Sequence, residues 1–161
     1  KMKVYFANDL FNDATLMYNE HVVSKIEEEL PDVEVYLPQR NDAINDKTQY
    51  ADSLTIVKAD YEELEDSDVL VAVIDSDDSG VALEIGMFYM MNKPIIGIYT
   101  DTRRIAYGNE QKKEAIDILG ENQIAYTNLM VIGAIKERGE LVDNHEEAIR
   151  LLKNLKSKED L

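Results

Sequence analysis

Glu84 is the residue whose type and position most clearly indicate chemistry in this sequence. It is the only charged residue in the segment 80–92, and helical spacing places it on one face with Val81, Ile85 and Phe88. A carboxylate there must be paired, hydrogen-bonded or held at a pocket wall, because burying it unpaired costs on the order of several kcal/mol. The alternative is a glutamate on a narrow exposed strip, or one that caps a neighbouring element. Glu84 is therefore the first candidate for a functional site.

The loop that leads into this helix is rich in aspartate. Asp78 or Ser79 is a natural N-cap, and Gly80 allows a ligand to approach the backbone closely. The alternative is that Asp75, Asp77 and Asp78 only cap the helix and keep the protein in solution, because a helix start stabilises acidic side chains. The cluster would repel phosphate, and the chain has no Gly-x-Gly-x-x-Gly or Walker-type loop. Dinucleotide and nucleoside triphosphate chemistry are therefore disfavoured.

Carboxylates near the ends of several strands could also collect Mg²⁺, which prefers oxygen ligands. A receiver-like module would use Asp9 and Asp75 around this ion. That alternative lacks a lysine directly after a strand, since Lys93 precedes its strand. The two histidines, His21 and His145, stand in polar helical contexts without a ligand partner at a metal spacing, so we expect both at the surface.

The composition describes an acidic chain with enough residues for a core. The 161 residues include 33 acidic and 17 basic side chains, a formal net charge of −16, and no cysteine. This length predicts a single domain over residues 1–161, of a size that buries about two-thirds of its unfolded surface. The lack of cysteine excludes a disulfide scaffold, a thiolate zinc site and a cysteine nucleophile.

The charge and the apolar runs also limit the partners. Binding to nucleic acid begins with neutralisation of phosphates by Lys and Arg, so the acidic balance argues against it and favours a small ligand that is neutral or cationic. No apolar run approaches the ~20 residues that span a bilayer, and no basic segment precedes an apolar one as in a signal peptide. We therefore expect a cytoplasmic protein that binds neither nucleic acid nor membrane.

The pattern along the chain predicts strands that alternate with helices. Apolar runs typical of strands occupy residues 4–7, 33–37, 69–74 and 95–99. Helical spacing predicts helices over 13–30, 48–67 and 81–92, and in the second of these Leu54, Val57, Tyr61 and Leu64 fall on one stripe. This order predicts an α/β fold, a flavodoxin- or Rossmann-like parallel sheet with helices on both faces.

The remaining segments have less regular patterns of apolar residues. Residues 38–47 and 101–109 are polar and loop-like, and the last third contains expected helices over 110–119, 128–138 and 144–156 with a short strand at 140–142. Ligands of such sheets bind beyond the carboxyl ends of the strands. This rule directs attention to residues 7–9, 38–46, 75–80 and 100–101.

Four parts of the chain resemble the nucleoside 2-deoxyribosyltransferases and their relatives, the deoxynucleoside 5′-monophosphate N-glycosidases. The matching parts are residues 4–7, Asp60 ahead of the strand at 68–74, residues 78–86, and residues 128–130. The Asp-x-Gly-x-x-x-Glu-x-Gly pattern over 78–86 is the most specific of them. All four occur in the order in which the family has them.

The resemblance implies a retaining displacement at the anomeric carbon of a 2-deoxyribonucleoside. Glu84 would be the nucleophile and form a 2-deoxyribosyl ester while the base leaves, after which a second free base attacks. Tyr5 would hydrogen-bond Glu84 and fix its rotamer. Asp60 and Asp78 match the family's acids, which contact the base and shuttle its proton. No metal or cofactor is implied, because the nucleophile is already anionic and a proton neutralises the leaving base.

The resemblance also implies a set of substrate-binding residues. Asn128 matches the residue that reaches from a neighbouring subunit to the sugar 5′-hydroxyl, which implies a homo-oligomer, although Asn128 could also cap the helix that follows. Asn128 together with Met130 favours a nucleoside over a nucleotide. Further candidates for contacts with the substrate are Phe6, Asn8, Gln39 and Gly80.

Three departures from the family pattern leave other functions open. Asn8 and Asp9 stand where transferases often have small residues, residues 38–46 align poorly, and residues 144–161 resemble the end of the hydrolases. The first alternative is therefore hydrolysis, in which water intercepts the same ester of a deoxynucleoside or its 5′-monophosphate. The second is a non-enzymatic module that binds a nucleoside, or the receiver-like Mg²⁺ module.

Overall fold

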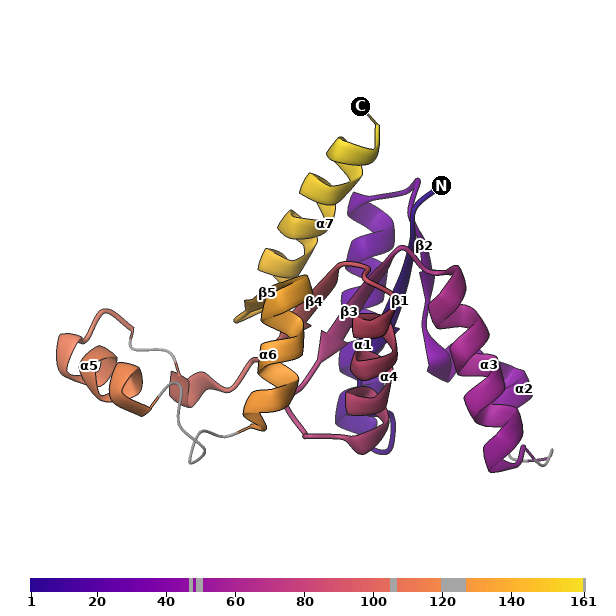
Figure 1. The fold of residues 1–161 in the computed structure, drawn as a ribbon, viewed down its shortest axis with the longest axis horizontal. Coiled ribbons are helices and arrows are strands. Elements are labelled where there is room, and N and C mark those ends of the chain that lie inside the picture. Colours follow the sequence, from indigo (N-terminus) through magenta and orange to yellow (C-terminus); the bar gives the residue numbers. More distant parts are fainter. Residues whose placement is uncertain (47, 49–50, 105–106, 120–126, 161) are drawn as a thin grey trace.

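The protein is built on one five-stranded parallel sheet (Figure 1). The computed structural model describes residues 1–46, 48, 51–104, 107–119 and 127–160. The strands lie in the order β2-β1-β3-β4-β5, which is the flavodoxin-like order and confirms the predicted fold class. Their bounds are β1 (Lys3–Ala7), β2 (Glu34–Tyr36), β3 (Val69–Val73), β4 (Ile95–Ile98) and β5 (Gly139–Val142).

Helices cover both faces of the sheet. On one face lie α1 (Asp13–Glu29) and α7 (His145–Glu159), and on the other lie α3 (Ser53–Asp66), α4 (Ser79–Met90) and α6 (Leu129–Arg138) (Figure 1). Successive residues of a strand point to opposite faces. Phe6 of β1 therefore packs with the α1 and α7 side, whereas Tyr5 packs with α3, α4 and α6. Among the described residues, no helix combines the length and the apolar character that crossing a membrane requires.

Short helices replace part of the loops predicted from polar composition. The segment predicted as a loop over residues 38–47 contains η1 (Pro38–Arg40) and α2 (Asp42–Asn45), and that prediction is wrong there. A proline at the first helical position favours η1, and the Asn41 side chain accepts a hydrogen bond from the Ala43 N–H at the start of α2. The polar segment 101–109 likewise contains η2 (Thr102–Arg104), which precedes α5 (Glu110–Leu119).

Caps decide where the longer helices begin. The second helix was expected from residue 48, but α3 begins at Ser53, because the Asp52 side chain accepts a hydrogen bond from the Thr55 N–H at 2.8 Å. Residues 49 and 50 of the expected helix, and residue 47 of the expected loop before it, lie outside the described residues. The strand expected over 33–37 is also shorter, since only Glu34–Tyr36 pair with β1.

The apolar stripe of α3 is mostly exposed. Leu64 is fully buried, but Leu54, Tyr61 and Val57 are 65%, 42% and 38% exposed. Periodicity reveals an apolar face but not what covers it. Within the described part of the chain, Leu54, Tyr61 and Val57 are only partly covered. On α4, Leu83 and Met90 are likewise exposed apolar side chains.

Candidate active site

Glu84, Tyr5 and Asp60 come together from three elements on one face of the sheet. Tyr5 lies on β1, Asp60 on α3 and Glu84 on α4. Strands β1 and β3 are neighbours, and the helices that follow them, α1 and α4, cover opposite faces, which makes this the point where such sheets bind ligands. The fold thus places the predicted nucleophile at the expected edge.

The start of α4 orients Glu84. The Asp78 side chain accepts a hydrogen bond from the Val81 N–H at 2.9 Å and is the N-cap, as predicted. Val81, Ile85 and Phe88 are buried against the sheet, so Glu84, one position before Ile85, is held at the edge of the core. Gly80 leaves room for this cap, since a Cβ there would lie 3.0 Å from Asp78 Oδ2.

Burial raises the pKa of Glu84 to about 7. The Tyr5 hydroxyl counteracts this by hydrogen bonding, which lowers the pKa, while the negative charges of Asp60 and Asp78 raise it further. A carboxyl group with this pKa changes its charge near neutral pH. Glu84 is therefore a partly buried acid of the kind found at active sites.

Tyr5 and Asp60 are buried polar groups with unsatisfied atoms. Within the part of the chain that the structure describes, neither the Tyr5 hydroxyl nor Asp60 Oδ1 forms a hydrogen bond of ordinary geometry. The hydroxyl is nevertheless close enough to both carboxyl groups to lower the pKa of each. Burial raises the pKa of Asp60, Tyr5 lowers it, and the charge of Glu63 raises it, with a net increase. Buried polar atoms without partners are rare, and here they surround the predicted nucleophile.

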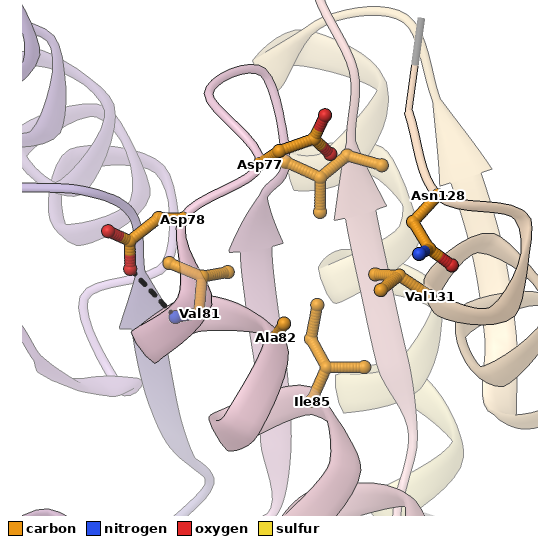
Figure 2. Close-up of a pocket in the computed structure, with 8 residues that line it drawn as sticks. Asp77, Asp78, Val81, Ala82, Ile85, Asn128 and Val131 are labelled. Carbon is orange, nitrogen blue, oxygen red and sulfur yellow. Dashed lines mark hydrogen bonds between the residues drawn. The ribbon is translucent and has the colours of Figure 1, made fainter. Parts of the chain in front are cut away.

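A second group of predicted residues lies between the start of α4 and the start of α6. A pocket of about 270 Å³ separates the start of α4 from the start of α6, and Figure 2 shows its lining. Its lining residues are Ile74, Asp77, Asp78, Val81, Ala82, Ile85, Asn128 and Val131. Asp78, at the start of α4, and Asn128, at the start of α6, lie on opposite sides of this pocket (Figure 2). Glu84 is not among the residues that line it.

Asn128 caps α6, which was the alternative role considered for it. Its side chain accepts a hydrogen bond from the Met130 N–H at 2.9 Å. Met130 is 86% exposed, so it projects from the surface of this chain. Both residues are therefore available to a neighbouring molecule.

Asn8 and Gln39 belong to a buried amide network. Asn8 donates to Asn19 Oδ1 at 2.8 Å, and Asn19 donates to Gln39 Oε1 at 2.9 Å. Gln39 in turn donates to the Leu16 carbonyl at 3.0 Å. These hydrogen bonds hold the Gln39 side chain, which remains half-buried. Phe6 is fully buried on the face opposite Glu84, and its side chain presents no surface to a ligand.

Asp9 and Asp75, the carboxylates of the receiver-like alternative, form hydrogen bonds with nearby groups of the chain. Asp9 Oδ1 accepts hydrogen bonds from the Phe11 N–H and Thr15 Oγ1, and Asp75 accepts hydrogen bonds from the N–H and the hydroxyl of Thr100. Across the described residues, no three His, Asp or Glu side chains form a group that could hold a metal ion.

The expectation that both histidines lie at the surface holds only for His21, which is exposed. The His145 side chain is only 18% exposed, because its ring packs edge-on against the His21 ring at 5.3 Å between centroids. The sequence pattern indicates only where each histidine lies on its own helix. Packing of α7 against α1 brings the two rings together.

Sequence reasoning assigned Asp77 only a capping role and gave Thr127 none. In the structure the Thr127 hydroxyl donates to Asp77 Oδ1 at 2.6 Å. No sequence signal pairs two residues this far apart. The clue available was that Asp77 lies beside Asp78 and Thr127 beside Asn128, both of which were candidate site residues.

Comparison with known proteins agrees with this geometry. A family model described as nucleoside 2-deoxyribosyltransferase matches residues 4–144. The solved structure of a conserved protein from Enterococcus faecalis is 42% identical, with a TM-score of 0.81, and the match covers 95% of this chain and 98% of that one. No curated protein matches the chain significantly.

Two more distant structures share the fold. A 2-deoxyribosyltransferase from Bacillus psychrosaccharolyticus is 19% identical, with a TM-score of 0.62, over 91% of this chain and 90% of that one. A CMP N-glycosidase from Clostridium botulinum is 15% identical, with a TM-score of 0.50, over 95% of this chain and 98% of that one. With the family match over most of its length, the chain belongs to the nucleoside 2-deoxyribosyltransferase family, whose enzymes transfer or hydrolyse glycosyl groups.

Proposed function

We propose that this protein transfers the 2-deoxyribosyl group between nucleobases, with Glu84 as the nucleophile. The observation that carries the proposal is the partly buried Glu84, whose pKa is raised to about 7 beside the Tyr5 hydroxyl and Asp60. A carboxylate with a raised pKa in a desolvated site is a stronger nucleophile than one in water. Family membership supports the same reaction class.

The reaction proceeds in two displacements at C1′. A Glu84 carboxylate oxygen bonds to C1′ while the C1′–N bond breaks, and the leaving base keeps the electron pair and takes up a proton. A second base then bonds to C1′ through a ring nitrogen and loses its proton, and the ester bond breaks to return the carboxylate. Each displacement inverts C1′, so the product retains the configuration of the donor.

Tyr5 and Asp60 have separate roles in this scheme. Burial and the charges of Glu84 and Asp60 raise the pKa of Tyr5 well above its usual range, so its hydroxyl stays protonated and can donate to Glu84. The raised pKa of Asp60 favours its protonated form, which suits a group that protonates the leaving base. Asp78 caps α4 and adds negative charge near Glu84.

We also propose that the working enzyme is a homo-oligomer in which Asn128 and Met130 bind the sugar in a neighbouring site. Two observations support this proposal. Asn128 is exposed at the start of α6, and Met130 is 86% exposed. The exposed side chains of Leu54, Leu83 and Met90 on α3 and α4 offer a second copy an apolar contact surface.

One experiment tests transfer directly. Deoxyinosine is incubated with the protein, with and without free adenine, and the products are separated by chromatography. Transfer predicts deoxyadenosine and hypoxanthine in the presence of adenine, and little hypoxanthine in its absence. Release of hypoxanthine at the same rate without adenine would identify a hydrolase instead. No reaction with either a purine or a pyrimidine donor would reject both.

A further inference from the structure

Asp77 has an unusual backbone conformation next to the proposed site. Its φ is +51°, in the left-handed region, which residues other than glycine seldom adopt although Asp and Asn tolerate it. The turn is closed by a hydrogen bond from the Asp77 N–H to the Ile74 carbonyl at 3.3 Å. This conformation aims the Asp77 carboxylate at α6, away from the start of α4 (Figure 2).

The Asp77 carboxylate fixes the residue that precedes Asn128. Thr127 is only 6% exposed, and its hydroxyl donates to Asp77 Oδ1 at 2.6 Å. Asn128 follows directly and caps α6 through the Met130 N–H. Asp77 and Asn128 also line the same pocket (Figure 2). A short hydrogen bond to a charged acceptor is stronger than a neutral one, so this link restrains the start of α6.

We propose that Asp77 is a positioning residue that acts across the subunit boundary. Through Thr127 it holds Asn128, and so it sets sugar binding in the neighbour's active site rather than in the site that contains its own chain's Glu84. This inference rests on the proposed function, in which Asn128 completes a neighbouring site. Asp78, the next residue, serves the chain's own site, so the loop after β3 contributes to two active sites.

Three variants separate the hydrogen bond from the backbone conformation. Asp77→Gly keeps the left-handed conformation but removes the acceptor, and Thr127→Val removes the donor at nearly constant shape. Each is expected to raise the KM for the deoxynucleoside donor about tenfold with a smaller effect on kcat. Asp77→Asn keeps an acceptor oxygen and the left-handed tolerance, so its donor KM should return to within about twofold of the unmodified value.

The double variant provides a check on the pair. If the two residues act only through their shared hydrogen bond, Asp77→Gly with Thr127→Val should raise the donor KM no more than either change alone. Additive effects, or an unchanged donor KM in Asp77→Gly, would overturn the proposal.

Mixed oligomers test the action across the boundary. An Asp77→Gly copy that keeps Glu84 is co-expressed with a large excess of a Glu84→Ala copy that keeps Asp77, and the mixed oligomers are purified through a tag on the minor copy. Every site that retains Glu84 then receives Asn128 from a chain with intact Asp77. The donor KM should return to the unmodified value.

The reciprocal mixture is the control. A minor unmodified copy is combined with an excess of a copy that carries both Glu84→Ala and Asp77→Gly, and here the donor KM should be raised. The opposite pattern in the two mixtures would mean that Asp77 acts within its own chain, and the proposal would be wrong. Absence of exchange by the unmodified protein would instead overturn the proposed function, so the two failures are distinguishable.

Discussion

Glu84 on α4 and Tyr5 on β1 shift each other's protonation in opposite directions. The Tyr5 hydroxyl lowers the pKa of Glu84, while the negative charge of Glu84, after burial, raises the pKa of Tyr5. The phenol therefore stays neutral while the carboxyl group changes its charge near neutral pH. This relationship places a proton donor, Tyr5, next to an acid that can ionise, Glu84.

The first prediction concerns the nucleophile. Glu84→Ala and Glu84→Gln should each lower the rate of base exchange by at least about 10³-fold, because neither side chain can form the ester. Exchange is measured by chromatography of the deoxyinosine and adenine reaction. Glu62→Gln, an exposed position on α3, is the matched control and should keep full activity. Substantial exchange in either Glu84 variant would reject the assignment.

The second prediction is a pH-dependent difference in stability. The pKa of Glu84 rises from 4.5 in the unfolded chain to about 7 in the folded protein, so the folded state holds the proton more tightly. The contribution of Glu84 to the free energy of unfolding is most favourable below pH 4.5. As the pH rises to about 7, this contribution falls by no more than about 3 kcal/mol. Glu84→Gln lacks this titration. Its melting temperature relative to the unmodified protein should therefore be higher at pH 8 than at pH 5, and an equal difference at both would contradict the raised pKa.

The third prediction concerns the pH profile of exchange. Because the nucleophile must be ionised, kcat/KM should increase as the pH rises through about 7. Tyr5→Phe removes the hydroxyl that lowers the pKa of Glu84, so this increase should move to higher pH, with a loss of about tenfold or more at neutral pH. Steady-state kinetics between pH 5 and 9 measure both effects. An unshifted profile in Tyr5→Phe would show that Tyr5 does not tune Glu84.

The fourth prediction concerns the exposed apolar surface on α3 and α4. Leu54 and Met90 are 65% and 75% exposed, and changing both to Glu should dissociate the oligomer and abolish exchange while the circular dichroism spectrum stays the same. Light scattering after size-exclusion chromatography measures the mass. The control changes Phe11 and Met17 to Glu. Phe11, just before α1, is 80% exposed, and Met17, on α1, is 73% exposed. Dissociation by the control alone would place the interface on the α1 side.

Much of the fold follows from local patterns. The apolar run of β3 and the helical spacing around Glu84 each depend on residues close together in the chain, and both predictions are confirmed. The capping role of Asp78 follows from the same kind of local chemistry. Local signals are weakest at short elements, because three or four residues such as those of η1 and α2 show no helical period.

The candidate site could be predicted only in part. An unaccompanied charge on an apolar face identifies Glu84 from sequence, and a family pattern adds Tyr5, Asp60, Asp78 and Asn128. Nothing local in the sequence indicates that Asn8 and Gln39 are engaged in an amide network with Asn19. Their hydrogen bonds join segments that meet only after the chain has folded.

By itself, the sequence determined the class of fold, the strands and most helices, and the carboxylate at the centre of the site. These depend on side-chain periodicity and capping, which act over a few residues. The tertiary structure alone decided that Tyr5 and Asp60 meet Glu84, and that Thr127, which precedes Asn128, pairs with Asp77. Those distances depend on strand order and helix packing, because contacts between residues far apart in the chain form only when the sheet assembles.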